Sequence, residues 1–443
     1  MKLKKLKLFI VIIIGIMLPI YSFAENTINI EDNAKKIVNE DIFKEINAPN
    51  LLLAETESGR ILYERNADER IYPASITKLM TAILVVENCK LDETVTVSEN
   101  AIKSVPSGYV NANLQVDEKL TVENLLNAML IPSANDAANA LAEHVGGSIQ
   151  SFASMMNTKA RELGCTGSNF NNPSGLHEEN HYTTTKDLLL ISSEAIKNNT
   201  IKTIIGKTTY TLPNSNKYSK TPRILTTTNY LKRKELSKYY YEYCVGGKTG
   251  YTGEAKNCVV VFANKDNVNL TAIVMGENAK VKGQKFLDAR QMFEYGFKNY
   301  ESRQVAKKDE IYENIKILNG TKETRNLSLI YKENVNIVVN KNKNIATVDW
   351  NQDKYNNDEY IMKKVEYTKV KAPIQTGEVI GKITYKYNGI EYSTDLIANG
   401  NVEESKILQQ IIQISIVILI IFIIYILLKS KIKNKKSKKR YRI

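Results

Sequence analysis

The first apolar segments of the folded part of the chain are short and are separated by a polar turn. Leu51–Ala54 and Ile61–Tyr63 flank a polar stretch that contains Ser58-Gly59, which predicts two strands joined by a hairpin. A longer apolar segment, Ser75–Glu87, begins shortly after a proline. Because a serine that follows proline and precedes apolar periodicity is typical of a helix start, this segment predicts a helix.

The segments that follow predict several helices and then a return to strands. Residues 120–160 have helical periodicity that is interrupted at Ile131-Pro132-Ser133, since proline biases the preceding residue away from helix. Three strands and a final helix are predicted, in order, over Tyr243–Thr249, Cys258–Ala263, Val268–Gly276 and Gln284–Tyr300. This order predicts an α+β fold, in which an antiparallel sheet flanked by helices has its first and last strands as neighbours and carries a helical insert. We assign this domain to residues 40–283.

Between residues 301 and 400 the pattern changes to short runs in which apolar and polar residues alternate. Ile345–Trp350 and Val379–Tyr387 are two of these runs. Asn388-Gly389 directly follows the second and is a strong signal for a two-residue hairpin turn. We therefore expect a second, small all-β domain over residues 301–400.

The N-terminal end, residues 1–24, has the layout of a secretory signal peptide. Lysines come first, an apolar run extends from Leu8 to Ile20, and Ser22-Phe23-Ala24 places small residues at the cleavage positions. An uncleaved N-terminal anchor is the alternative. We expect the folded body of the protein to be exported.

A second long apolar run extends from Ile411 to Leu428. At about 1.5 Å per residue, a helix of this length crosses a hydrocarbon core of about 30 Å with modest tilt. We predict a transmembrane helix over residues 407–428 and, because positive flanks stay on the cytoplasmic side, a basic cytoplasmic tail over residues 429–443. The expected localisation is the cell membrane, with a single C-terminal pass and the folded domains extracytoplasmic.

The formal net charge of +13 could indicate a partner of opposite charge such as nucleic acid. The excess charge lies at the two ends, however. Four lysines stand among the first seven residues and nine Lys or Arg among the last fifteen, and neither segment contains Asp or Glu. The region between them is close to neutral, so a basic groove for phosphates is not expected and we predict no nucleic-acid partner.

Cysteine and histidine usage does not suggest a metal site. The four cysteines show no CxxC or other metal-binding spacing, and we expect buried free thiols although export permits disulfides. They are Cys89, Cys165, Cys244 and Cys258. His177 and His181 lie in a segment that reads as loop, with no third ligand evident, so we expect no metal and no cofactor.

Three short motifs occur in one order along the chain. They are Ser75-Ile76-Thr77-Lys78, Ser133-Ala134-Asn135 and Lys248-Thr249-Gly250. Each motif alone is weak, because the serines could only cap helices, Lys78 could lie on a solvated face, and the third motif could only end a strand. Their joint occurrence in an exported chain, each at a plausible structural position, is much more specific.

The first motif has the parts of an activated nucleophile. The Ser75 hydroxyl needs a base to take its proton, and Lys78, three residues on, lies on the same face of a helix. A lysine amine acts as a base only when it is neutral, which burial and a second positive charge, that of Lys248, would favour. Ser75 at a helix N-terminus would also stand where the helix dipole favours developing negative charge.

The other two motifs suit the binding of a peptide that ends in a carboxylate. Ser133 can relay a proton to a leaving amine, and the amide of Asn135 can bond to a peptide backbone. Lys248 and Thr249 suit a free carboxylate. Gly250 allows a substrate backbone to approach an edge strand closely. The backbone N–H groups of Ser75 and Tyr251 are the expected oxyanion-hole donors.

With these motifs, the chain resembles the low-molecular-weight penicillin-binding proteins, specifically the D-alanyl-D-alanine carboxypeptidases of the S11 serine peptidase family. The resemblance covers nearly the whole exported body. Beyond the three motifs it rests on Asn172–His177, His181–Thr184, Gly246–Thr252, Asp288-Ala289-Arg290, Tyr295-Gly296-Phe297 and Gly377–Gly381.

The resemblance implies that Ser75 is the acyl-enzyme nucleophile, Lys78 is its general base, and Lys248 and Thr249 recognise the terminal carboxylate. Ser133 and Asn135 would form the second element of the site. The implied substrates are peptidoglycan stem peptides that end in D-Ala-D-Ala, and β-lactams would acylate Ser75. The small β domain would space the enzyme above the membrane.

The chain departs from the family pattern in two places. Many relatives hold the membrane by an amphipathic C-terminal helix, whereas this chain has the long apolar run and basic tail. Tyr251 follows the third motif where some relatives carry histidine, which could affect substrate preference or deacylation.

Three alternatives stay open at this point. A class A β-lactamase shares the motif order, but its glutamate lies downstream of the second motif, whereas Glu123–Asn127 here lies upstream and in a helical pattern. A D,D-endopeptidase that cuts cross-links could use the same site. The third is a non-catalytic cell-wall or β-lactam-binding module.

Overall fold

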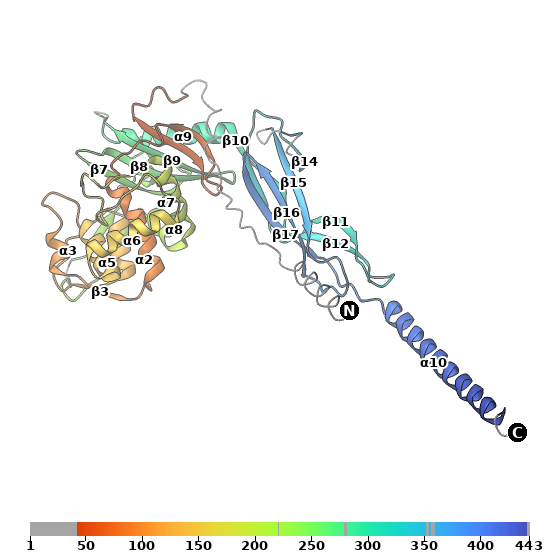
Figure 1. Cartoon of the computed structure of the whole chain (residues 1–443). Coiled ribbons are helices and arrows are strands. Elements are labelled where there is room, and N and C mark those ends of the chain that lie inside the picture. Colours follow the sequence, from red (N-terminus) through yellow and green to blue (C-terminus); the bar gives the residue numbers. More distant parts are fainter. Residues whose placement is uncertain (1–41, 220, 279–280, 351–353, 356–358, 441–443) are drawn as a thin grey trace, which may run out of the picture. The chain divides into compact units, whose positions relative to one another are not determined.

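The computed structural model describes residues 42–440 apart from 220, 279–280, 351–353 and 356–358 (Figure 1). The predicted signal peptide lies outside the described residues, as do the last three residues of the predicted tail.

A five-stranded sheet in the order β2-β1-β9-β8-β7 forms the centre of the first domain, and each neighbouring pair is antiparallel. Its strands are β1 (Asn50–Glu55), β2 (Ile61–Arg65), β7 (Cys244–Thr252), β8 (Lys256–Lys265) and β9 (Val268–Glu277). Leu52 of β1 pairs with Ile273 of β9, so the first and last parts of the domain are neighbours and the predicted fold class is confirmed.

The insert between β2 and β7 is mainly helical. Its helices are α2 (Lys78–Asn88), α3 (Glu99–Lys103), α4 (Val122–Leu130), α5 (Asn135–Gly146), α6 (Ile149–Glu162), α7 (Thr185–Lys197) and α8 (Asn199–Gly206), with short 3₁₀ turns η3 (Ala74–Thr77) and η4 (Tyr230–Lys232). Two small hairpins complete it, β3 (Thr94–Thr96) with β4 (Lys119–Thr121) and β5 (Thr209–Leu212) with β6 (Arg223–Thr226). As predicted, Pro132 lies in the break between α4 and α5.

Both faces of the sheet are buried, which explains why β8 and β9 read as almost continuous apolar runs. Successive side chains of a strand point to opposite faces. Val260 and Ile273 pack with the insert helices, whereas Val261 and Val274 pack on the other face with α9 (Gln284–Asn299). Figure 1 shows α9 and the insert helices on opposite sides of β7, β8 and β9.

The apolar helix predicted from Ser75 begins differently in the structure. Ala74–Thr77 form the 3₁₀ turn η3, and the α-helix starts only at Lys78. Ala74 has a φ of 47°, which is unfavourable for a residue with a Cβ, so the chain enters the turn in a strained conformation. Side chains three residues apart eclipse in a 3₁₀ turn, and this geometry sets Ser75 and Lys78 one above the other.

Two glycines allow neighbouring backbone to pack directly against η3. A Cβ at Gly175, whose φ is 80°, would lie 1.8 Å from the carbonyl oxygen of Ala74. A Cβ at Gly250 in β7 would lie 3.2 Å from the backbone nitrogen of Ser75. The 3₁₀ turn is therefore held between the Gly175 loop and the edge strand of the sheet.

The residues after α9 form an all-β region. Its strands are β10 (Tyr300–Ala306), β11 (Ile311–Lys316), β12 (Asn326–Tyr331), β13 (Val335–Asn340), β14 (Ala346–Asp349), β15 (Tyr360–Tyr367), β16 (Val379–Tyr387) and β17 (Ile390–Ala398). Six strands form a sheet in the order β11-β12-β17-β16-β15-β14, and β10 pairs with β13. Asn388 and Gly389 connect β16 to β17 and have φ of 50° and 78°. A two-residue hairpin turn of this type requires positive φ at both residues, so the predicted hairpin is present.

The last element is a single long helix, α10 (Ile407–Arg440). Its segment Gln410–Lys429 is long and apolar enough to cross a membrane by length and composition. Large apolar side chains along this segment are exposed, for example Ile418 and Phe422.

We predict that Gly175→Ala destabilises the protein much more than Gly59→Ala does. Both glycines have positive φ, 80° and 70°, so both substitutions introduce backbone strain of about 1 kcal/mol. A Cβ at Gly59 meets no atom within 4 Å, whereas the clash at Gly175 forces η3 to move, at a further cost of about 2 kcal/mol or more. In thermal unfolding of the purified chain, the melting temperature of Gly175→Ala should fall at least about 4 °C below that of Gly59→Ala. Equal melting temperatures would contradict this account of the turn.

Candidate active site

The fold brings the three sequence motifs together at one place. Lys78 Nζ lies 2.9 Å from Ser75 Oγ and 2.7 Å from Asn135 Oδ1, and Lys248 Nζ lies 2.7 Å from Ser133 Oγ. These residues come from η3 and α2, from the start of α5 and the connection before it, and from β7. The contacts join residues 57 and 115 positions apart, so tertiary packing assembles the site.

The environment of Lys78 suits a neutral amine. The side chain is fully buried, and Nζ donates to Asn135 Oδ1 and, over 2.6 Å, to the carbonyl oxygen of Ser174. Both oxygens can only accept hydrogen bonds, so a neutral amine would use its two N–H groups on them. Its lone pair would then face Ser75 Oγ, the third neighbour.

Electrostatics favour this neutral form. Burial, and after it the positive charge of Lys248, lower the pKa of Lys78 well below its ordinary value, while Asp136 acts in the opposite direction. Burial, and then the Lys285 charge, lower the pKa of Lys248 to about 7. Lys285 is itself buried, which lowers its pKa to about 8, and its Nζ donates to the Gly250 carbonyl oxygen over 3.3 Å.

The three buried lysines make the site attractive to an anion. Within the described part of the chain, Lys78, Lys248 and Lys285 have no carboxylate within salt-bridge distance. Buried charges without partners are expensive, so each lysine either becomes neutral or gains from a bound negative group. The site is thus arranged to accept a carboxylate close to a serine hydroxyl.

Ser133 and the edge strand complete the arrangement. Ser133 has a φ of 75°, a conformation that is rare outside glycine and that directs its hydroxyl to Lys248. Thr249 Oγ1 lies 2.5 Å from the hydroxyl of Thr228, a contact that the sequence motifs did not indicate. Tyr251, two residues further along β7, is 64% exposed.

Asp136 anchors the loop beside Asn135. Its carboxylate is buried, which raises its pKa, and it accepts hydrogen bonds from the backbone N–H groups of Ala112 and Leu114. The backbone N–H of Asn135 donates to the carbonyl of Val110 over 2.9 Å. The loop therefore holds the start of α5 in register. Neither contact follows from the sequence motifs, although an acidic residue in the first turn of a helix is a recognisable N-terminal signal.

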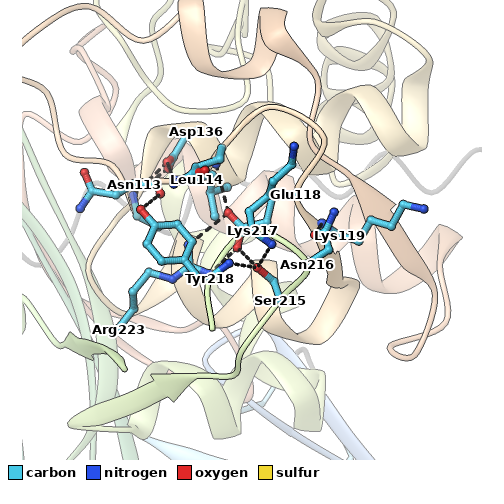
Figure 2. A network of polar contacts seen from close by, with 12 residues as sticks. Asn113, Leu114, Glu118, Lys119, Asp136, Ser215, Asn216, Lys217, Tyr218 and Arg223 are labelled. Carbon is cyan, nitrogen blue, oxygen red and sulfur yellow. Dashed lines mark hydrogen bonds and ion pairs between the residues drawn. The ribbon is translucent and has the colours of Figure 1, made fainter. Parts of the chain in front are cut away.

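Figure 2 shows how the same loop is tied to the β5–β6 hairpin. The buried Glu118 forms an ion pair with Arg223 and accepts a hydrogen bond from Ser215 over 2.7 Å. The Tyr218 hydroxyl donates to the carbonyl of Asn113 over 2.9 Å. This polar network holds the loop that precedes α5 through contacts between residues 97 and 105 positions apart.

The Asn172–His181 segment contacts both Lys78 and η3. Asn172 Oδ1 accepts from the backbone N–H of Gly175 over 2.8 Å, which presents the Ser174 carbonyl to Lys78. His181 Nδ1 accepts from the backbone N–H of Asn171 over 3.1 Å, so Nε2 carries the proton and donates to Thr77 Oγ1 over 2.9 Å. Burial lowers the pKa of His181 to about 4, and the neutral ring braces η3.

The cysteines largely match the predicted state. All four are free thiols, and Cys165, Cys244 and Cys258 are buried. Cys89 differs from the prediction because it is only half-buried at the end of α2.

Two family models match the chain. Residues 34–279 match the peptidase S11 model, described as D-alanyl-D-alanine carboxypeptidase, and residues 300–404 match the C-terminal domain of penicillin-binding protein 5. D-alanyl-D-alanine carboxypeptidase DacF of Bacillus subtilis is 32% identical over 348 residues, which span 77% of this chain and 82% of that relative.

Solved structures share the fold. Penicillin-binding protein 5 from Haemophilus influenzae superposes with a TM-score of 0.59 at 25% identity, covering 81% of this chain and 98% of that protein. A peptidoglycan synthesis regulatory factor, PBP3, from Streptococcus pneumoniae has a TM-score of 0.68 at 23% identity over 81% of this chain and all of that protein, which supports the fold alone. Because the peptidase model spans more than half of the sequence, this chain belongs to the S11 family of D-alanyl-D-alanine carboxypeptidases.

Proposed function

We propose that this protein removes the terminal D-alanine of peptidoglycan stem pentapeptides through an acyl-enzyme on Ser75. The observation that carries the proposal is the position of Lys78 Nζ, which is fully buried and lies between Ser75 Oγ and two oxygens that can only accept. Such an amine is available as a base at neutral pH.

Acylation uses the contacts of the site in sequence. Lys78 takes the proton of Ser75 Oγ as the oxygen attacks the carbonyl carbon of the penultimate D-alanine. The backbone N–H groups of Ser75 and Tyr251 stabilise the oxyanion. The C–N bond then breaks, and the leaving nitrogen receives a proton relayed through Ser133 Oγ.

The same site explains selectivity for a free terminal carboxylate. Lys248 and the Thr249 hydroxyl receive that carboxylate, while Asn135 bonds to the peptide backbone. Water then attacks the acyl carbonyl, its proton returns to Ser75 Oγ, and the ester bond breaks. A β-lactam carries a comparable carboxylate and acyl carbonyl, so it acylates Ser75 in the same way.

The domain order supports a placement at the outer face of the cell membrane, where the protein would take part in cell wall biogenesis and cell shape. The apolar segment of α10 is the proposed membrane anchor, with the basic tail on the cytoplasmic side. The all-β domain between the peptidase and α10 is the proposed spacer. The peptidase then works on the extracytoplasmic cell wall, after removal of the signal peptide.

We expect Ser75→Ala to abolish both release of D-alanine from a pentapeptide and formation of a covalent penicillin adduct, because Ser75 Oγ is the one hydroxyl hydrogen-bonded to Lys78 Nζ among the described residues. Lys78→Arg should lower acylation by at least about 10³-fold, since a guanidinium stays protonated. Mass spectrometry of the intact protein measures the penicillin adduct, and mass spectrometry of free D-alanine measures its release. An adduct that forms on Ser75→Ala would refute the assigned nucleophile, and near-normal acylation of Lys78→Arg would refute the assigned base. Cys165→Ser, a buried thiol away from the site, is the control.

We also expect a bell-shaped pH dependence of kcat/KM for a pentapeptide. The value of kcat/KM rises as Lys78 loses its proton, at a pH well below the usual pKa of lysine. It falls as Lys248 is deprotonated above about pH 7. The falling limb arises because neutral Lys248 no longer attracts the substrate carboxylate. A pentapeptide with an amidated C-terminus lacks that attraction and should keep only the rising limb. An identical falling limb for both peptides would assign it to another group.

A further inference from the structure

A second group of reactive side chains lies outside the active site. Cys89, Glu93 and His144 each offer one ligand atom, and these three atoms lie within 4.8 Å of one another. Cys89 follows the last residue of α2, Glu93 lies in the connection to β3, and His144 lies in the last turn of α5. Among the residues that the structure describes, no other three Cys, His, Asp or Glu side chains converge in this way.

The group lies at the opposite ends of the two helices that carry catalytic residues. α2 starts at Lys78 and α5 at Asn135, both in the active site, and their C-terminal ends bear Cys89 and His144. At about 1.5 Å per residue, the 11 residues of α2 separate the two places by roughly 16 Å. The cluster is therefore separate from the catalytic contacts.

Glu93 and His144 form a long hydrogen bond whose geometry is also compatible with two ligands of one metal ion. Glu93 Oε2 and His144 Nε2 are 3.3 Å apart, which is long for a hydrogen bond to a carboxylate. Two ligands that are each about 2.0–2.1 Å from a tetrahedral zinc ion stand about 3.3 Å apart. The observed separation thus equals one edge of a zinc coordination tetrahedron.

The side chains are also held in place by neighbouring backbone. Glu93 Oε1 accepts from the backbone N–H of Lys90 over 2.6 Å, which leaves Oε2 for a ligand. The Glu93 carbonyl accepts from the backbone N–H of Val122 over 2.9 Å, and the Cys89 N–H donates to Val85 over 3.0 Å. Such outer contacts orient the ligands of metal sites and limit the rearrangement that binding requires.

The charges around the cluster favour a cation. A divalent cation bound here would deprotonate the Cys89 thiol and balance the charge of the Glu93 carboxylate.

We propose that Cys89 Sγ, Glu93 Oε2 and His144 Nε2 bind a zinc ion, with water in the fourth position. Thiolate and imidazole together select zinc over the calcium and magnesium of the cell exterior, which prefer oxygen ligands. The ion would join the C-terminal ends of α2 and α5 and the β3 connection. Its role is to stabilise the helical insert that supports the active site.

Cobalt substitution in the full-length chain, purified in detergent and freed of metal by a chelator, tests the proposal. Equimolar Co²⁺ should produce a thiolate-to-cobalt charge-transfer band in the near ultraviolet and the visible bands of a tetrahedral ion. Zn²⁺ should abolish both. Zn²⁺ should also raise the melting temperature of the wild-type chain, because it binds only the folded state.

Matched variants separate this site from other ligands. Cys89→Ser should remove the charge-transfer band, and His144→Gln should weaken Co²⁺ binding at least tenfold. Cys165→Ser and His177→Gln, which alter a thiol and an imidazole elsewhere, should leave the spectrum unchanged. Circular dichroism confirms that each variant is folded. A wild-type chain without the near-ultraviolet band, or a band that persists in Cys89→Ser, would overturn the proposal.

Discussion

The contact on which the active site depends is the burial of one lysine amine against two oxygens and a serine hydroxyl. Lys78 has no carboxylate partner at salt-bridge distance among the described residues, so its charged form is costly in the protein interior. The acceptors come from distant parts of the chain, the side chain of Asn135 and the carbonyl of Ser174. Correct folding of the insert is therefore a condition for having a neutral amine beside Ser75.

Several locally unfavourable features follow from that requirement. Ala74 and Ser133 adopt positive φ. Glycine is needed at positions 175 and 250 because atoms of the Pro73–Ser75 segment occupy the space that a Cβ would fill. Each feature lowers the stability of the fold on its own. It persists because the packing around it holds the backbone in that conformation. The buried apolar side chains on both faces of the sheet supply the favourable energy against which this strain is maintained.

The helical insert connects the active site to the proposed zinc site through two elements. α2 and α5 each carry a residue of the proposed active site at the first position and a proposed zinc ligand at or near the other end. A metal ion there would restrain the two helices relative to each other without contact to the substrate. The contacts of the proposed active site and the proposed metal contacts thus use the same pair of helices for different purposes.

The amino-acid sequence by itself determined the fold class, the insert between the first and last strands, the Asn388-Gly389 hairpin and the three motifs that meet in the site. These depend on local patterns: apolar periodicity, proline and glycine positions, and residues a few positions apart. It did not indicate the roles of the Ser174 carbonyl, Thr228, Lys285 or Asp136, nor the convergence of Cys89, Glu93 and His144. Those contacts join segments whose separation along the chain carries no periodic signal, so only the packing of the helices against the sheet decides which side chains meet. The 3₁₀ start of the helix at Ser75 was likewise decided by tertiary packing, because Gly175 and Gly250 press backbone against that turn from two sides.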